Sequence, residues 1–302
     1  MKKYYFLLIS ALFLFSCKSS LPEVIEQQEN QVQTKQTEKE TDKKFTKLCR
    51  EVAGYSLEKQ QGILSMVSIP DSKLTNATVK FLKKHYVSGI ILFKKNIENE
   101  KQLKQLIKDL RQKVYPNLLI GVDQEGGDVV RIKWDKTAKV SACDIGKRGD
   151  KKYAYKIAYE RAKMLKELGF DITFGPVCDI AESENSYIYN RAFGTDPEKV
   201  AEFVAITVKA QRDAGIISVL KHFPGYGNNV DTHIGEATDN RSLDDLRDND
   251  FVPFVAGIES GAGCILIAHN IIKSVDSENP ASLSSKMHEI LRKELEYNNV
   301  II

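Results

Sequence analysis

The segment Lys221–His233 concentrates side chains that could perform acid–base chemistry. Its letters, KHFPGYGNNVDTH, hold two of the five histidines of the chain, together with a lysine and an aspartate. An imidazole has an unperturbed pKa of roughly 6.5 and exchanges protons near neutral pH. Asp231 lies two residues before His233, where it can hold the tautomer of the ring and stabilise its cationic form. The two residues are therefore a candidate general acid/base pair. A turn-capping aspartate beside an exposed loop histidine is the alternative.

A zinc site made of His222, Asp231 and His233 is a second interpretation of this segment, since imidazole and carboxylate groups suit zinc. The glycines between these residues make a poor preorganised frame for a metal ion. The cysteines form no CxxC pair, and Cys178 and Cys264 lie in apolar runs, which is typical of small core residues. We therefore predict no metal site.

Two further groups of polar residues could bind a compound rich in hydroxyl groups. In the stretch DQEGGDVVR, Asp123 can accept and Arg131 can donate hydrogen bonds to adjacent hydroxyls, while Glu125 can pair with a neighbouring base. Lys221 and His222 follow an apolar run, which indicates that at least one of these side chains points into a site of low dielectric. A solvated basic pair is the alternative for these two residues.

These residues are far apart in the chain, and a regular alternation of segments predicts how they are brought together. Short apolar runs alternate with longer segments that place apolar residues three and four positions apart. The runs cover residues 63–69, 88–93, 117–123, 172–180, 217–223, 263–270 and 299–302, and the clearest helical segments cover 99–114, 152–168 and 197–214. Near-continuous apolar strands separated by helices predict βαβ units in a parallel sheet that is buried on both faces.

We predict an α/β fold, a (β/α)8 TIM-type barrel that is truncated after the seventh strand. No GxGxxG motif follows the first strand, so a Rossmann sheet is disfavoured. Functional residues of such barrels lie at the carboxyl ends of the strands. Polar residues lie at the carboxyl ends of four of the seven runs, namely Asp123 to Glu125, Asp179, Lys221 with His222, and His269 with Asn270. This pattern predicts one shared site at that end of the barrel.

The N-terminal region predicts export and a lipid anchor. Residues 1–17 have two lysines, an apolar run and the sequence LFSC, which resembles a bacterial lipobox with Cys17 as the lipidated residue. An ordinary signal peptide or an uncleaved anchor is the alternative. Residues 18–44 are polar and predict a disordered tether, and the folded domain is expected over 45–302. The protein is thus expected outside the cytoplasm on a bacterial membrane. Its net charge of +3 predicts no nucleic-acid partner.

Seven motifs in order resemble the N-terminal barrel of glycoside hydrolase family 3, in its β-N-acetylglucosaminidase branch. They are SGIILFKKNIEN, LLIGVDQEGGDVVRI, FGPVCDI, YNRAFGTDP, KHFPGYGNNVDTH, ILIAHN and PASLSSKMHEILRKEL, within about residues 62–302. The resemblance implies a retaining exo-hydrolase that releases N-acetylglucosamine from peptidoglycan fragments or related saccharides, without a metal or organic cofactor. His233, oriented by Asp231, would be the acid/base. The implied sugar contacts are Asp123, Arg131, Arg191, Lys221 and His222.

The chain departs from the family pattern in two places. Only three residues separate Gly227 from Asp231 where the family has four, and Tyr226 stands where His or Leu is usual. The aspartate nucleophile of the family follows the seventh strand, so its position is expected just beyond Ile302. Arg191 could alternatively fix a loop through a salt bridge. Two other functions stay open, a β-glucosidase of the same family and a lipoprotein that binds saccharides without turnover.

Overall fold

The computed structural model describes residues 46–227, 229 and 235–302. The chain divides into two units, Met1–Gln61 and Gly62–Ile302, and the predicted site residues that are described all lie in the second. The predicted Cys17, Asp231 and His233 lie outside the described residues, as do the signal peptide and the tether. Among the helices of the described part, none combines the length and the apolar character needed to cross a membrane.

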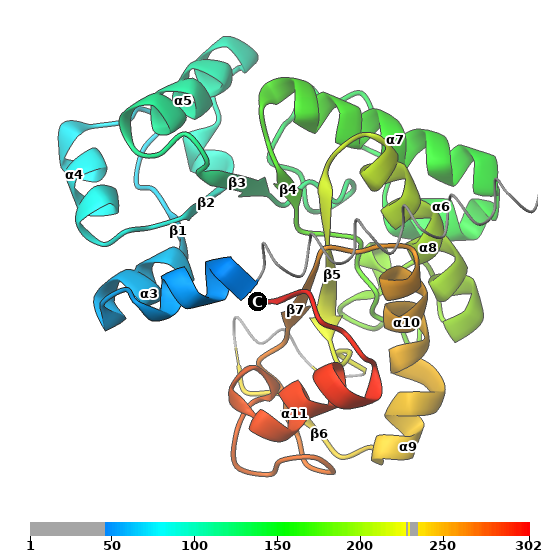
Figure 1. Cartoon of the computed structure of the whole chain (residues 1–302). Coiled ribbons are helices and arrows are strands. Elements are labelled where there is room, and N and C mark those ends of the chain that lie inside the picture. Colours follow the sequence, from blue (N-terminus) through cyan, green and yellow to red (C-terminus); the bar gives the residue numbers. More distant parts are fainter. Residues whose placement is uncertain (1–45, 228, 230–234) are drawn as a thin grey trace, which may run out of the picture. The chain divides into compact units, whose positions relative to one another are not determined.

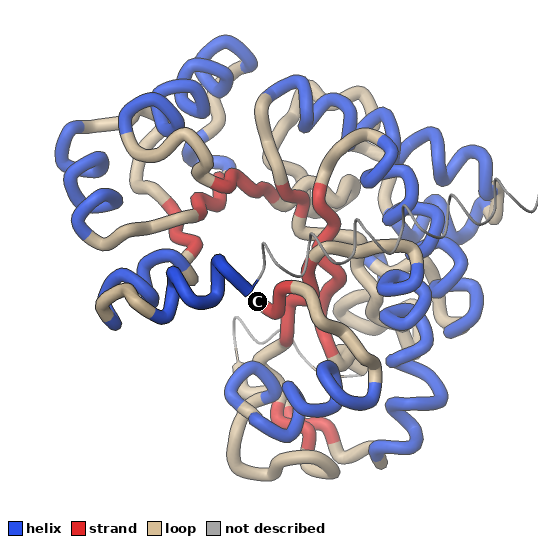
Figure 2. The backbone as a smooth tube through the Cα atoms, in the orientation of Figure 1, coloured by secondary structure: helices blue, strands red, loops and turns tan. Residues whose placement is uncertain are grey.

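The second unit is built on seven parallel strands that pair in the order β1-β2-β3-β4-β5-β7-β9 (Figures 1 and 2). Each strand pairs with its predecessor in parallel register, for example Ile90 with Ile120 and Val219 with Cys264. The strands are β1 (Met66–Ser68), β2 (Gly89–Leu92), β3 (Leu119–Val122), β4 (Ile172–Thr173), β5 (Ile217–Phe223), β7 (Cys264–Ile267) and β9 (Val300–Ile301). The sheet curls like part of a barrel, so the predicted fold class is confirmed.

Within the second unit, helices connect the strands and cover the outer face of the curled sheet (Figure 1). The α-helices are α3 (Leu57–Ile63), α4 (Asn76–Lys84), α5 (Glu100–Lys113), α6 (Ala142–Arg148), α7 (Lys151–Leu168), α8 (Pro197–Asp213), α9 (Leu243–Asp245), α10 (Phe251–Glu259) and α11 (Ser285–Glu289), with a further helical segment at 46–53. The 3₁₀ helices are η1 (Lys94–Asn96), η2 (Tyr189–Arg191) and η4 (Ala281–Leu283), and the π-helical segments are η3 (Leu246–Asp250) and η5 (Ile290–Glu294). A second sheet pairs β6 (Thr238–Asp239) with β8 (Ile271–Ile272).

The three helices predicted from spacing are present and begin at side-chain caps. Asn99, Asp150 and Asp196 each accept a hydrogen bond from a backbone N–H in the first turn of α5, α7 and α8. Such caps satisfy N–H groups that have no partner within the helix. The observed helices differ by one residue at most at either end from the predicted ranges 99–114, 152–168 and 197–214.

Alternation along the strands separates an outer core from an inner one. On β2, Ile90 and Leu92 pack outward beneath α5, whereas Ile91 faces inward. On β5, Leu220 packs outward against α8 and α10, whereas Val219 faces inward. Successive residues of a strand point to opposite faces, so Lys221 falls on the same inner face as Val219.

Candidate active site

A pocket of about 410 Å³ lies at the carboxyl ends of the strands of the main sheet. This volume falls within the range typical of small-molecule sites. Its lining comes from loops or ends of β2, β3, β4, β5 and β7 and includes Phe93, Asp123, Glu125, Arg131, Tyr187, Arg191, Lys221, His222, Tyr226 and His269. The five predicted sugar-binding residues are therefore brought together in one cavity.

A bulge in β5 presents two successive residues to this pocket. In the pairing of β5 with β7, Lys221 is opposite Leu266 and Phe223 is opposite Ile267, so His222 is an extra residue in the ladder. A regular strand would direct Lys221 and His222 to opposite faces. Bulges often redirect a side chain beside an active site. Both residues line the pocket, while Phe223 returns to the outer core.

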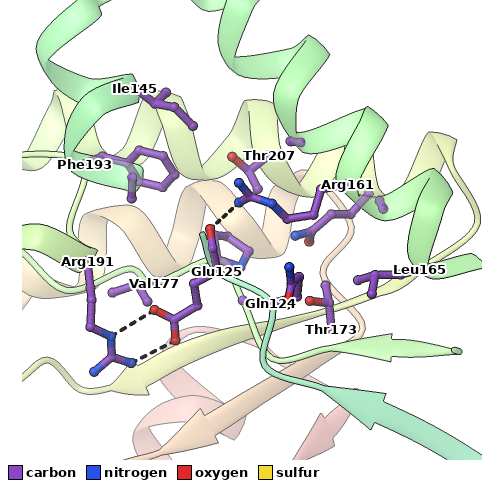
Figure 3. Close-up of a pocket in the computed structure, with 16 residues that line it drawn as sticks. Gln124, Glu125, Ile145, Arg161, Leu165, Thr173, Val177, Arg191, Phe193 and Thr207 are labelled. Carbon is purple, nitrogen blue, oxygen red and sulfur yellow. Dashed lines mark hydrogen bonds and ion pairs between the residues drawn. The ribbon is translucent and has the colours of Figure 1, made fainter. Parts of the chain in front are cut away.

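Lys221 lies at the centre of a buried ion-pair network. Its Nζ is 2.8 Å from Oδ1 of Asp123 and 2.6 Å from Oε1 of Glu125. Arg191 donates to both oxygens of Glu125 at 2.9 Å, and Arg161 donates to the backbone carbonyl of Glu125 (Figure 3). An ammonium group has three donors. Two of them are directed at carboxylates, so one is left for a ligand hydroxyl.

The electrostatics of this network fix its charge state. Burial opposes ionisation of Glu125, but Lys221 and Arg191 outweigh burial and lower the pKa of its carboxyl to about 2. Burial likewise opposes the charge on Lys221, yet Glu125 and Asp123 raise the pKa of its ammonium group above the ordinary value. Both groups are therefore charged at neutral pH. The pocket floor offers fixed charges with fully directed hydrogen bonds, as preorganised polar sites require.

His222 is oriented by Asp179, the buried carboxylate that follows the fourth predicted strand. Nδ1 of His222 is 2.8 Å from Oδ2 of Asp179, and the backbone N–H of His222 donates to the same oxygen at 3.2 Å. Burial lowers the pKa of the imidazole, although Asp179 opposes this shift. A neutral ring that donates from Nδ1 has an acceptor at Nε2. His222 can thus accept a hydrogen bond from a sugar hydroxyl.

Arg131 combines a weak ion pair with an aromatic neighbour. Its Nη2 is 3.7 Å from Oδ2 of Asp123, and its guanidinium lies 5.9 Å from the centre of the Phe93 ring. Nε of Arg131 is buried and has no hydrogen-bond partner among the described residues. A buried donor without a partner is costly, so this side chain is suited to contact a ligand.

Three functional neighbours were not among the predicted site residues. Glu125 was expected only to pair with a base, and it is the shared partner of Lys221 and Arg191. Asp179 was noted at a strand end without a role, although its place directly after an apolar run was a usable signal. Tyr187 lines the pocket and accepts a hydrogen bond from Arg191 at 3.2 Å, and no spacing in the sequence indicates this.

The described residues of the pocket form no metal centre. Across residues 46–227, 229 and 235–302, no three His, Cys, Asp or Glu side chains are grouped so that they could hold a metal ion. The alternative zinc site of His222, Asp231 and His233 includes residues outside this part of the chain. His222 itself is directed to Asp179 through Nδ1.

The fold and the site define a class of protein. A curled parallel sheet with carboxylates, arginines and a Lys-His pair converging at its carboxyl edge has the architecture of a TIM-type enzyme for a substrate rich in hydroxyl groups. Residues 56–302 match the glycosyl hydrolase family 3 N terminal domain. The chain belongs to this family, as its motifs predict.

Relatives within the family have related recorded activities. The β-hexosaminidase of Stenotrophomonas maltophilia is 36% identical over 244 residues, which cover 78% of this chain and 72% of that protein. NagZ from Neisseria gonorrhoeae, solved in complex with N-trifluoroacetyl-D-glucosamine, has a TM-score of 0.74 at 32% identity over 78% of this chain and 72% of that chain. A family 3 β-N-acetylglucosaminidase from Paenibacillus has a TM-score of 0.77 at 30% identity; the match covers 82% of this chain and 49% of that one. The predicted family and glycosidase class are confirmed.

Proposed function

We propose that the protein is a retaining exo-β-N-acetylglucosaminidase that releases terminal N-acetylglucosamine from peptidoglycan fragments or related saccharides. The activity of the relatives, a β-hexosaminidase and a β-N-acetylglucosaminidase, supports the reaction and the sugar. The chain spans about half the length of the Paenibacillus enzyme, and the proposal concerns the whole protein. Peptidoglycan fragments as the source of the sugar come from the resemblance of the motifs.

The observation that carries this proposal is the convergence of Lys221, Asp123 and Arg131 in one pocket. Adjacent hydroxyls of a pyranose both donate and accept hydrogen bonds. Asp123 can accept while Lys221 and Arg131 donate, and His222 adds a neutral acceptor. These groups are already oriented by one another, so a sugar would bind without a large cost of ordering side chains.

The chemistry requires two further groups. A retaining glycosidase uses an acid that protonates the leaving oxygen and a carboxylate that traps the anomeric carbon. We assign the first role to His233 with Asp231. Asp123 and Glu125 are both directed at Lys221, so neither is placed as a free nucleophile. The nucleophile is assigned to the position that follows β9 in the family pattern.

Removal of the acid/base tests the assignment. With p-nitrophenyl N-acetylglucosaminide as substrate, His233→Ala should lower kcat/KM by roughly 10²- to 10⁴-fold, the usual contribution of a positioned acid or base. His85→Ala is the matched control, since His85 caps α4 and does not line the pocket. Equal rates for the wild type and His233→Ala would contradict the role of His233.

The same assay separates the alternative functions. Faster hydrolysis of the p-nitrophenyl glucoside than of the N-acetylglucosaminide would favour a β-glucosidase. Binding of N-acetylglucosamine without turnover in the full-length wild-type protein would favour a saccharide-binding lipoprotein. Absence of both binding and turnover would overturn the proposal.

We also propose that Cys17 carries a lipid that tethers the protein outside the cytoplasm. The support is the sequence alone, a basic start and an apolar run that ends at LFSC. Wild-type protein expressed with labelled fatty acid should carry the label and sediment with membranes. Cys17→Ser should lose both properties, whereas Cys49→Ser, which changes the exposed cysteine of the folded part, should keep them. If Cys17→Ser still sediments with membranes, as Cys49→Ser should, the anchor at Cys17 is contradicted.

A further inference from the structure

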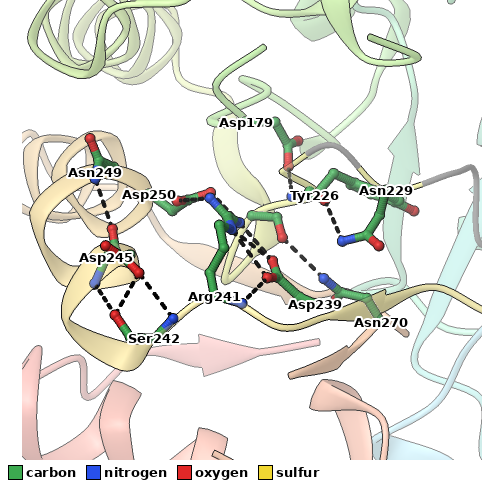
Figure 4. Close-up of polar contacts among 11 residues, drawn as sticks. Asp179, Tyr226, Asn229, Asp239, Arg241, Ser242, Asp245, Asn249, Asp250 and Asn270 are labelled. Atoms are coloured by element: carbon green, nitrogen blue, oxygen red, sulfur yellow. Dashed lines mark hydrogen bonds and ion pairs between the residues drawn. The ribbon is translucent and has the colours of Figure 1, made fainter. Parts of the chain in front are cut away.

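A second buried ion-pair cluster lies beside the pocket and is centred on Arg241. Its Nη2 is 2.7 Å from Oδ2 of Asp239, and its Nη1 is 2.7 Å from Oδ2 of Asp250 (Figure 4). Nε and Nη2 donate further bonds to the same two carboxylates, and the backbone N–H of Arg241 donates to Asp239 at 2.9 Å. Both carboxylate side chains are only 3% exposed. A planar guanidinium that forks onto two carboxylates fixes geometry as well as charge.

The turn that leaves β5 is packed directly on this cluster. A Cβ added to Gly225 would be 2.2 Å from Oδ1 of Asp250, and one added to Gly227 would be 2.6 Å from Nη2 of Arg241. Both glycines have positive φ, +127° and +55°. No other residue type combines this backbone conformation with so close an approach.

Two more side chains hold the same turn from the carboxyl ends of neighbouring strands. Oδ1 of Asp179 accepts a hydrogen bond from the backbone N–H of Tyr226 at 2.8 Å, while its Oδ2 accepts from His222. Nδ2 of Asn270 donates to the carbonyl of Gly225 at 3.1 Å (Figure 4). The turn is therefore tied both to the sugar-binding His222 and to the cluster at Arg241.

The cluster at Arg241 also contacts the chain on both sides of residues 228–238. Gly227 contacts Arg241, and Asp239, the last residue of β6, is its bidentate partner. Asp231 and His233 lie between Gly227 and Asp239 in the sequence. The described residues on either side of these two, Gly227 and Asp239, thus both lie at one guanidinium. Fixing the ends of a segment reduces the conformational entropy that its residues retain.

We propose that Arg241, held by Asp239 and Asp250, is a positioning residue for the acid/base step. This inference rests on the proposed function of His233. Arg241 fixes the two ends of the acid/base segment relative to Lys221 and His222, and it does not touch the substrate. Misplacement of a catalytic group by about 1 Å can lower a rate by about 100-fold. Loss of the clamp should therefore lower kcat and leave sugar binding intact.

Three substitutions in the full-length protein test this separation. Gly227→Ala removes no charged group but pushes a methyl group against Arg241; it should lower kcat per folded molecule at least tenfold. Arg241→Ala should lower kcat further, and Arg241→Lys should restore only part of it, because an ammonium group lacks the planar fork. In all three, the Kd for N-acetylglucosamine should change much less than kcat, because Lys221, Asp123 and Arg131 keep their contacts. Arg247→Ala is the matched control, since Arg247 pairs with Glu294 and Asp244 on the surface of the neighbouring turn.

Hydrogen exchange of the peptide that spans residues 222–229 gives a readout that is independent of turnover. Exchange at Gly225 and Tyr226 should be at least tenfold faster in Gly227→Ala and in Arg241→Ala than in Arg247→Ala. Unchanged exchange overturns the inference whether or not the protein hydrolyses sugars. Hydrolysis with unchanged kcat per folded molecule in these variants also overturns it and leaves the proposed function standing. A wild type without turnover rejects the proposed function and, with it, the role of Arg241.

Discussion

Lys221 shows how strongly the charged residues of the pocket depend on one another. Its side chain is 4% exposed, and it is the common partner of Asp123 and Glu125. Removing one member of a buried ion pair leaves an uncompensated charge and typically costs about 3–5 kcal/mol. A substitution at Lys221 will therefore disturb folding as well as sugar binding. Roles in binding are better tested at Arg131, whose side chain is 26% exposed and whose ion pair with Asp123 is 3.7 Å long.

Acid should destabilise the protein through Glu125. The pKa of this carboxyl is lowered from 4.5 to about 2 in the folded protein. A lowered folded pKa contributes stability above the unfolded value, and the contribution is lost as pH falls from about 4.5 towards 2. A shift of this size corresponds to about 3 kcal/mol in the unfolding free energy. Urea unfolding measured between pH 6 and pH 3 should show about two thirds of this loss in the wild type, since the folded carboxyl is still ionised at pH 3.

The variant Glu125→Gln isolates the contribution of the ionised carboxyl to stability. Glu125→Gln cannot titrate, so its deficit relative to the wild type should be largest at pH 6 and should shrink towards pH 3. Glu167→Gln, at an exposed site on α7, provides the control and should follow the wild type throughout. Parallel curves for the wild type and Glu125→Gln would contradict the stabilising role of the ionised carboxyl.

Five of the residues that line the pocket were predicted from the sequence, but their pairing was not. Asp123, Arg131, Arg191, Lys221 and His222 share one cavity because parallel strands end at one edge. Which residues pair depends on differences of a few tenths of an ångström in the positions of segments that are far apart in the chain. The salt bridge foreseen as an alternative for Arg191 is present with Glu125. Arg191 also lines the pocket, so its sugar contact stays a prediction.

At the scale of elements, all seven strands of the main sheet were predicted, and the differences have local causes. The fourth was predicted over 172–180 and pairs only at Ile172–Thr173. Pro176 has no N–H for a ladder, which interrupts the regular pairing after Thr173. The chain stays hydrogen-bonded to β5 through the carbonyls of Gly175 and Pro176 and through the N–H of Cys178. The two-residue strands β6 and β8 were not predicted, because a pair of residues carries no periodicity.

Close packing between α6 and the segment that follows η2 gives a prediction about Gly146. A Cβ at Gly146 would be 1.6 Å from the backbone carbonyl oxygen of Phe193, two residues after Arg191. Gly→Ala in a helix ordinarily stabilises by about 1 kcal/mol. Overpacking against a backbone atom costs about 1–3 kcal/mol or more, and a carbonyl cannot move aside as a side chain can.

We therefore expect Gly146→Ala to lower the unfolding free energy by about 2 kcal/mol, measured by the urea midpoint. Lys152→Ala, at an exposed position of the next helix, should change it by less than about 0.5 kcal/mol. An unchanged or raised midpoint for Gly146→Ala would show that α6 can move away from Phe193 without cost.

At the scale of the whole second unit, the outer core is divided into two clusters. One is built largely from β2, β3, α5 and the end of α7, and the other from α8, α10, β5 and β7. Asp123 and Glu125 come from the half that contains β3, whereas Lys221 and His222 come from the half that contains β5. The ion pairs of the pocket therefore join the two halves of the fold, and substrate binding should strengthen both together.

The order of strands in the main sheet has a consequence for the time at which the site forms. Because neighbours in the sheet are also neighbours in the chain, each new strand finds its partner already synthesised. A ribosome adds about 5–20 residues per second, so Lys221 is made on the order of 5–20 s after Glu125. Arg131 and Arg191, which pair with Asp123 and Glu125, are made before Lys221. During translation, β5 therefore adds last the buried cation that both carboxylates share and completes the floor of the pocket.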